Sequence, residues 1–448
     1  MWCALAVSAL VAPIVAVCAA GEVKPCAQEF ESFVERFNKH YATIGEREKR
    51  LAIFCSNYDY ITEHNAKDHS YTLGITEFAD LFFSEFANMY NNSVPQPTKS
   101  DLLLQGIPFA GVHYASGATV PSAVDWRDKG AVTSVKQQGQ CGSCWAFTTA
   151  GAIEGSWQIA TGELASLSPQ QFVDCSSSPS GANNGCKGGN FIYAANYAIE
   201  NGICNDASYP YTEKQGKCHS SACKVVVPHH GVLRVKQVDP KDENALKEAV
   251  GNQPVGCSIA ASSRAFQLYQ KGVLSDDECG DEVNHAVLII GYGTEQGRDY
   301  WLIKNSWGVH WGEHGFGKLR RGLPGSEYGE CGIKHYAQTY VIVDGSRAQP
   351  MNILPSLIAG AVAAAVLGII VLGCFSRRIV AWCRHRRSNG GAPLLHVQAG
   401  RQRELGAVSH PSARPSQNTG RAGNSRDSTL LNKQQPRQAP ASSANVNV

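Results

Sequence analysis

The sequence predicts an α+β protein, and three stretches of the chain carry that prediction. Residues 46–65 and 144–160 place apolar side chains at the 3.6-residue spacing of helices that bury one face. The run "HAVLIIGYG", which His285 opens, is apolar over most of its length, as expected of a buried strand. Helices and strands are therefore both expected in the folded part of the chain.

Length and charge limit the possible functions. The chain has 448 residues, which exceeds one ordinary domain and is enough for a sizeable core. Its net charge of +2 gives no general attraction to nucleic acid, and no nucleic-acid partner is expected. Sixteen cysteines are a high number, and their meaning depends on the compartment in which the chain folds.

Two apolar runs predict that compartment. Residues 4–20 are uncharged and end in small side chains, so we expect a signal peptide over 1–20. The positive start of such a peptide is missing, and an uncleaved anchor is the alternative, which Pro13 and the short run disfavour. Residues 353–375 carry no charge and are long enough for a transmembrane helix.

Arginines follow this second run, beginning at Arg377 and ending at Arg387, so the positive-inside rule places the C-terminus in the cytosol. We expect a single-pass type I membrane protein of the secretory pathway, in lysosomes, endosomes or at the cell surface. The segment 345–352 would be a linker. Residues 376–448, rich in Ser, Pro, Gln and Arg, are predicted to be a disordered cytosolic tail.

The stretch "QQGQCGSCWAF", residues 137–147, contains a candidate nucleophile. A cysteine attacks as its thiolate, so its surroundings must favour the anion. Cys144 is expected in the first turn of the helix 144–160, with Ser143 as N-cap, where backbone N–H groups and the helix dipole favour negative charge.

Three further residues can complete such a site. His285 can exchange a proton with the sulfur and with a leaving amine. Asn305 can accept the ring N–H and so orient the imidazole. Gln138 can donate its side-chain N–H to an oxyanion, together with the Cys144 backbone N–H.

The motifs "QGQCGSCWAF", "NHAV…GYG" and "KNSWG" resemble, in that order, those of the papain family of cysteine proteases. The resemblance implies a two-lobed fold over 120–344, with a helical left lobe and a β-barrel-like right lobe. It also implies that Trp307 shields the hydrogen bond between His285 and Asn305 from water.

A second resemblance lies upstream, in the helix 46–65. It carries the interrupted signature of cathepsin L-like pro-segments at six positions, namely Glu46, Arg50, Phe54, Asn57, Ile61 and Asn65. "GITEFAD", from Gly74, is similar to the second motif of such segments, except for Thr76 in place of Asn. An inhibitory pro-segment over 21–119 is implied. Asn91 is the one N-x-S/T acceptor, a predicted glycosylation site.

The family resemblance also implies disulfides, in a compartment that permits them. It pairs Cys141 with Cys186, Cys175 with Cys218 and Cys279 with Cys331. A likeness to malarial members of the family predicts a fourth bridge, Cys204–Cys223. Cys257 is expected to be a buried free thiol.

The substrate cleft is assigned by the same resemblance. Gly188 and Gly189 would present backbone to an extended peptide, and Trp307 would border the site. The pocket for the residue two before the scissile bond maps to Phe191, Ser258, Val283, Ala286 and Tyr336, with Tyr336 at its floor. Its mostly apolar walls predict a preference for Leu or Val over Arg.

We therefore expect a membrane-tethered zymogen of a cysteine endopeptidase that acts on proteins or peptides, without metal or cofactor. Between Cys175 and Cys186 there is no histidine-bearing insertion, which disfavours an exopeptidase. Transpeptidation through the same acyl-enzyme is one alternative, which analysis of the products can test. A receptor-like binding protein is another, although the catalytic residues and the pro-segment are both present.

Overall fold

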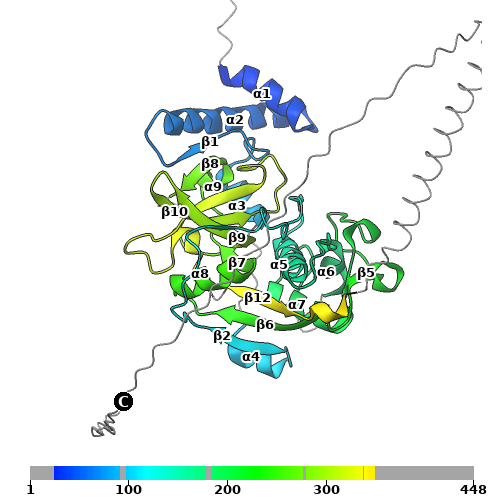
Figure 1. Ribbon diagram of the computed structural model, residues 1–448. Coiled ribbons are helices and arrows are strands. Elements are labelled where there is room, and N and C mark those ends of the chain that lie inside the picture. Colours follow the sequence, from blue (N-terminus) through cyan, green and yellow to red (C-terminus); the bar gives the residue numbers. More distant parts are fainter. Residues whose placement is uncertain (1–24, 91–96, 177–182, 276–278, 337, 349–448) are drawn as a thin grey trace, which may run out of the picture. The chain divides into compact units, whose positions relative to one another are not determined.

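The computed structural model describes residues 25–90, 97–176, 183–275, 279–336 and 338–348 (Figure 1). The predicted signal peptide, Asn91, the run 353–375 and the tail lie outside these residues. Within the described ranges, no helix has both the length and the apolar character needed to cross a membrane.

A mixed sheet of ten strands forms the backbone of the described fold, which confirms the α+β prediction. Nine strands follow the order β1-β8-β11-β10-β9-β7-β12-β6-β2, and β3 pairs with β9. These strands are β1 (Tyr71–Leu73), β2 (Phe109–His113), β3 (Val124–Asp125), β6 (Val232–Val238), β7 (Val255–Ile259), β8 (Tyr269–Leu274), β9 (His285–Glu295), β10 (Arg298–Lys304), β11 (Phe316–Arg320) and β12 (Thr339–Val343).

The central helix α5 (Cys144–Thr161) begins and ends where the sequence predicts. Gly162 ends it in the left-handed conformation, with φ of 77°, which glycine adopts without strain. The helix packs against β9, β12 and β7 on one side and against the helices α6 and α7 on the other. It thus joins the sheet to a helical layer.

The helical layer forms its own hydrophobic cluster, which includes Trp145, Trp157 and Phe172. A second cluster, around Trp301, Trp307 and Trp311, fills the side of the sheet built from β8 to β11. The two clusters correspond to the two expected lobes. The remaining elements here are α6 (Pro169–Cys175), α7 (Phe191–Asn201), α8 (Glu243–Asn252), α9 (Arg264–Gln267), the small sheet of β4 (Ile203–Cys204) and β5 (Val225–Val227), and the 3-10 turns Asp206–Ser208, Ser220–Ala222, Glu330–Gly332 and Gly345–Arg347.

The N-terminal segment folds as helices, as its periodicity predicts. Its elements are α1 (Pro25–Arg36), α2 (Ile44–Asn65), α3 (Phe83–Tyr90) and α4 (Lys99–Leu104), together with β1 and β2. Thr43 caps α2 through its hydroxyl, and the predicted Glu46–Arg50 pair forms with an N–O distance of 2.6 Å. Phe54 is fully buried, in contact with Phe30 and Phe33 of α1.

This segment is anchored to the sheet domain by hydrogen bonds from both of its signature motifs. The Arg264 guanidinium donates to Asn57 Oδ1 at 2.9 Å, and the Asn57 amide donates to the carbonyl of Ala79. Thr76, which departs from the expected motif, is buried and donates to the Gln267 carbonyl at 3.0 Å. The hydroxyl therefore supplies a bond that holds this turn against α9.

Five disulfides are present in the described residues. Four are the expected pairs Cys141–Cys186, Cys175–Cys218, Cys204–Cys223 and Cys279–Cys331. The fifth, Cys26–Cys55, joins α1 to α2 and was not expected. Cys144 and Cys257 are free and buried.

Candidate active site

The structure brings together the four residues in which the sequence places the chemistry. Cys144 is the first residue of α5, and His285 is the first residue of β9. Asn305 directly follows β10, and β9 and β10 are neighbouring antiparallel strands. The backbone N–H of Ala286, the residue after His285, hydrogen-bonds the Cys144 sulfur, so the start of α5 lies against the start of β9.

Cys144 lies against the backbone of β9. The N–H groups of Ala286, Trp145 and Cys144 itself hydrogen-bond the sulfur, which favours its anion. Burial acts in the opposite direction and dominates, so that the pKa of the Cys144 thiol is raised to about 11. In this form of the chain the sulfur therefore carries its proton at neutral pH.

Ser143 occupies the N-cap position of α5, but its side chain makes no capping bond, contrary to the prediction. Its hydroxyl contacts the Tyr211 hydroxyl at 2.6 Å instead, and Tyr211 in turn donates to the carbonyl of Gln138. The first N–H groups of the helix are therefore not closed off by this side chain, which keeps the helix end available to the Cys144 sulfur.

The His285 ring is oriented by Asn305. Nε2 of His285 lies 2.8 Å from Asn305 Oδ1, which also accepts the Ser306 backbone N–H at 2.8 Å. An amide oxygen can only accept, so Nε2 carries the ring hydrogen and Nδ1 is the nitrogen that can take up a proton. Burial lowers the pKa of His285 to about 4, against the opposing effect of the Asn305 bond, so the imidazole is neutral at pH 7.

Trp307 covers this pair. Its ring stacks on the His285 ring with centroids 4.5 Å apart, and it is fully buried. Phe78 and Phe86, from the N-terminal segment, meet the Trp307 ring edge-on at 5.3 and 5.4 Å. The N-terminal segment thus packs on the outer side of the ring that covers His285.

Gln138 is held from both sides of the site. Its Nε2 donates to the Cys141 carbonyl at 3.0 Å, and its Oε1 accepts from the Ser306 hydroxyl at 2.6 Å. These bonds determine the orientation of the amide, and an amide nitrogen has a second hydrogen besides the one bound to Cys141. Ser306 was not singled out from the sequence, although it stands inside the quoted "KNSWG" motif.

The predicted substrate-binding residues are only partly grouped. Ser258 and Ala286 are register partners of β7 and β9, and Phe191 packs beside Gly256 of the same strand β7. Gly188 and Gly189 follow shortly after Cys186, whose carbonyl accepts the Gly142 N–H. A side chain at Gly189 would collide with the Trp145 ring. Val283 is half-buried in front of β9. Tyr336 is 41% exposed, and its ring lies tilted against the His335 ring with the centroids 4.6 Å apart.

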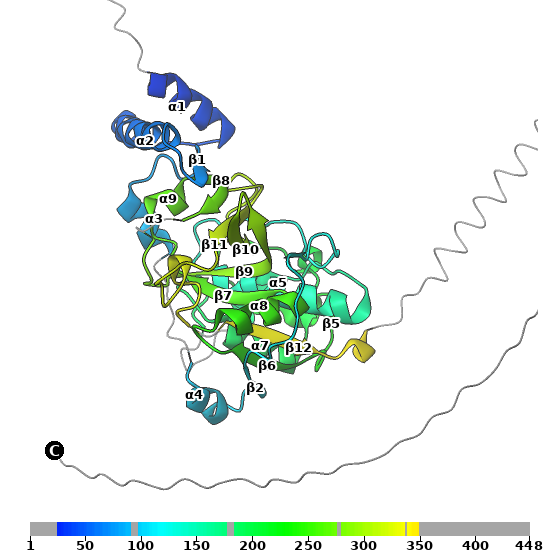
Figure 2. The ribbon, with the colours of Figure 1, turned by 60° about the vertical axis from the view of Figure 1, so that its left-hand side comes forward.

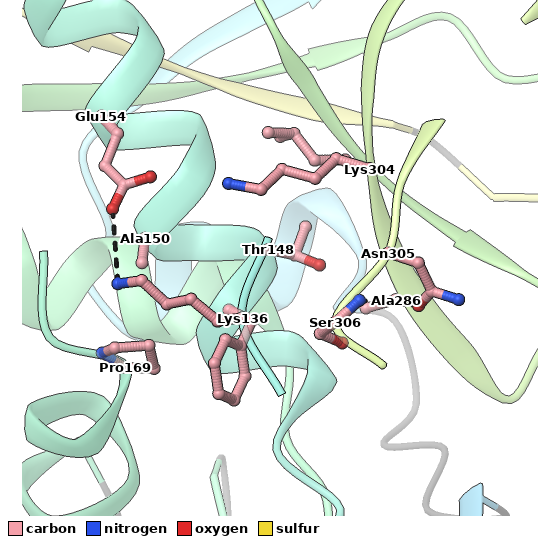
Figure 3. Close-up of a pocket in the computed structure, with 11 residues that line it drawn as sticks. Lys136, Thr148, Ala150, Glu154, Pro169, Ala286, Lys304, Asn305 and Ser306 are labelled. Atoms are coloured by element: carbon pink, nitrogen blue, oxygen red, sulfur yellow. Dashed lines mark hydrogen bonds and ion pairs between the residues drawn. The ribbon is translucent and has the colours of Figure 1, made fainter. Parts of the chain in front are cut away.

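Behind the site lies a partly buried network of charged side chains that the sequence did not predict, and Figure 3 shows its members Lys136, Glu154 and Lys304. Lys304 Nζ donates to Thr133 Oγ1 at 2.8 Å, and Thr133 donates to Glu154 Oε2 at 2.6 Å. Lys136 lies 3.8 Å from the other Glu154 oxygen and 3.1 Å from Asp206. The lysine at the end of the apolar run "YWLIK" was the available signal.

This network connects the two lobes directly behind the catalytic residues. Glu154 belongs to α5, the helix of Cys144, and Lys304 is the last residue of β10, next to Asn305. Burial lowers the pKa of Lys304 to about 8, although the Glu154 carboxylate opposes this shift.

Comparisons with known proteins agree with this geometry. The family model "Papain family cysteine protease" matches residues 120–341, and "Cathepsin propeptide inhibitor domain (I29)" matches 30–86. The probable cysteine proteases RD21B and RDL4 of Arabidopsis thaliana are 44% and 42% identical to the chain. These matches cover 69% and 68% of this chain, and 64% and 81% of the two relatives.

Solved structures show the same likeness. Digestive procathepsin L 3 from the larval midgut of Tenebrio molitor aligns with a TM-score of 0.62 and 34% identity, over 72% of this chain and 100% of that one. The proform of the ragweed pollen allergen Amb a 11, a cysteine protease, aligns with a TM-score of 0.62 and 38% identity, over 71% and 95%. The chain therefore belongs to the papain family of cysteine proteases, and it carries a cathepsin-type propeptide inhibitor domain.

Proposed function

We propose that the chain is the zymogen of a cysteine endopeptidase that cleaves peptide bonds through a Cys144 thioester. The observation that carries the proposal is the pairing of His285 Nε2 with Asn305 Oδ1 at 2.8 Å, because it leaves Nδ1 to exchange a proton with the Cys144 sulfur at the start of α5.

The reaction would proceed in two steps. The Cys144 thiolate attacks the peptide carbonyl carbon, and the second N–H of Gln138 and the Cys144 backbone N–H bind the oxyanion. His285 then gives its proton to the leaving amine as the C–N bond breaks, which leaves an acyl-thioester. Water, deprotonated by His285, attacks the thioester and releases the acid with the thiol regenerated.

In the described chain, burial opposes formation of the thiolate–imidazolium pair that the reaction needs. A neutral thiol with a pKa of about 11 beside a neutral imidazole with a pKa of about 4 is not the reactive ion pair. Both shifts arise mainly from burial. Release of Phe78 and Phe86 from Trp307 would admit water and allow the proton to move from the sulfur to His285.

For the substrate, we propose that the side chain two before the scissile bond is aliphatic. Phe191, Ser258 and Ala286 supply neutral walls, and Val283 and Tyr336 complete the proposed set without adding a carboxylate. An arginine would be desolvated there without a partner for its charge, so Leu or Val should be favoured by about tenfold or more.

Two peptidyl epoxides, one with Leu and one with Arg at that position, test both proposals. After removal of the pro-segment at acidic pH, we expect labelling of the wild type, none of Cys144→Ala, and faster labelling by the Leu probe. Labelling that is independent of Cys144, or absent, contradicts the enzyme proposal. Faster labelling by the Arg probe contradicts the pocket assignment alone.

We also propose that residues 353–375 tether the zymogen to an endolysosomal or surface membrane, with 376–448 in the cytosol. The support is the uncharged run and the arginines that follow it. Carbonate extraction of membranes from expressing cells should leave the unprocessed chain in the pellet. An unprocessed chain that is wholly extracted would contradict the tether.

A further inference from the structure

The N-terminal segment contacts the papain-like domain through two separate parts, at opposite edges of the sheet. Strand β1 pairs with β8 at one edge, and β2 pairs with β6 at the other. Figure 2 shows α1 and α2 beside β1 and β8, and α4 and β2 beside β6. The matched inhibitor family ends at residue 86 and the protease family begins at 120, so α4 and β2 belong to neither match.

The second part, residues 97–119, which we call the strap, is built into the helical lobe. Leu102 of α4 is fully buried and Ile107 is 3% exposed, and both belong to the cluster of Trp145 and Trp157. The residues of the first part, from Phe30 to Phe86, belong instead to the cluster of the opposite lobe. The two parts therefore have no hydrophobic cluster in common.

The strap is also held by its backbone. The Val235 N–H donates to the Pro108 carbonyl and the Asp239 N–H donates to the His113 carbonyl, both at 2.9 Å. Strand β2 thus adds a parallel edge strand to β6, which is a mode of binding that main-chain hydrogen bonds support without a covalent link.

Glu248 of α8 clamps the far end of the strap. Its carboxylate accepts the backbone N–H groups of Ser116 and Gly117 and the Ser116 hydroxyl, at 2.9 to 3.0 Å. His113 of the strap lies 3.6 Å from the same carboxylate. The hydrogen bonds from the Ser116 backbone N–H, the Ser116 hydroxyl and the Gly117 N–H lower the pKa of Glu248, so the carboxylate stays charged at neutral pH. Ser116 and Gly117 lie upstream of Val120, where the predicted protease domain begins, so a cut before Val120 leaves their hydrogen bonds to Glu248 intact.

We propose that the strap is a separate docking module, which stays bound to the mature domain as a non-covalent edge strand after the inhibitor part, residues 25–90, has been cut away. The inference rests on the zymogen function proposed above. The surface along β6 and α8 is thus occupied by the chain's own residues 97–119. They are held there by burial of Leu102 and Ile107, by the pairing of β2 with β6 and by the Glu248 carboxylate. Maturation would then release the inhibitor part and leave the strap on the mature domain.

The test uses a Cys144→Ala chain that an unrelated sequence-specific protease can cut. Its recognition sequence replaces residues 91–96 and is inserted a second time between Thr119 and Val120. The cut protein is passed over a size-exclusion column, and intact-mass analysis records which fragments remain with the domain that begins at Val120. Because the cuts do not need Cys144, failure of the enzyme proposal leaves this test unaffected.

Two variants separate the modules. Glu248→Gln should speed release of the strap by about tenfold or more and leave release of the inhibitor part unchanged. Arg264→Ala removes the hydrogen bonds to Asn57 and Ser56. It should speed release of the inhibitor part and leave release of the strap unchanged. Glu200→Gln, at an exposed glutamate of α7, is the matched control and should change neither. Loss of the strap from the unsubstituted cut protein before or together with the inhibitor part, or joint release of both parts in each variant, would overturn the proposal.

Discussion

Replacing Cys144 by alanine is expected to lower kcat/KM for peptide hydrolysis by roughly 10⁴ or more, the size seen when a catalytic nucleophile is removed. The chain should remain folded, because the sulfur is buried but makes no covalent link, and its loss opens only a small cavity. We expect the free energy of unfolding of the proenzyme to change by about 1 kcal/mol or less.

Replacing Cys141 and Cys186 together by alanine should instead lower the stability of the fold. Their bridge closes a loop over a separation of 45 residues and fixes the carbonyl of Cys141, to which Gln138 donates. We expect a loss of about 2–5 kcal/mol from the free energy of unfolding. Urea denaturation of the proenzyme and kcat/KM after processing by added wild-type enzyme measure both effects. Full activity in Cys144→Ala, or unchanged stability in the double variant, would contradict the division of roles.

The catalytic residues were predictable because the chemistry restricts both their type and their setting. Cys144 could be placed at a helix start from the periodicity of 144–160, and His285 at a strand start from the apolar run. The bond from His285 to Asn305 needed the pairing of β9 with β10, which only the family resemblance implied.

The features that were missed depend on contacts between distant elements. Ser143 has the right residue type for a cap, yet the neighbouring Tyr211 hydroxyl takes its side chain. The pairing of Cys26 with Cys55 requires α1 to lie on α2, and the sequence near either cysteine does not predict that packing. Strand β2 is short and half-buried, and its partner β6 begins only at Val232, so its pairing had no sequence signal.

The network around Glu154 was likewise hidden, since its members come from α5, from β10, from the loop before α5 and from the 3-10 turn that Asp206 opens. Removal of the Glu154 carboxylate is expected to lower the free energy of unfolding substantially. Glu154→Gln keeps the size of the side chain but removes the carboxylate that Thr133 links to Lys304, whereas Lys136 keeps Asp206 at 3.1 Å. Breaking a buried pair on one side leaves an uncompensated charge, so we expect a loss of about 3–5 kcal/mol at pH 7.

The pH dependence of this stability loss tests whether the unpaired charge of Lys304 causes it. Its pKa in the folded chain, about 8, is below its value in the unfolded chain, so the unfolded state holds more protons between the two values and stability rises with pH there. Loss of the Glu154 charge lowers the folded pKa further, which moves the start of this rise to lower pH. The cost of Glu154→Gln should therefore fall as the pH rises toward about 8 and stay constant above it, where Lys304 is neutral in both folded proteins.

Urea unfolding of the Cys144→Ala proenzyme from pH 6 to 10 measures this dependence. Adding Lys304→Met to Glu154→Gln should recover most of the loss at pH 7, because the variant then holds neither of the two charges that the Thr133 hydroxyl links. Glu200→Gln, on the exposed end of α7, should change stability by less than about 0.5 kcal/mol at every pH. A cost of Glu154→Gln that is independent of pH, or one that Lys304→Met increases, would show that the carboxylate acts through its bond to the Leu167 N–H and not as the counter-charge of Lys304.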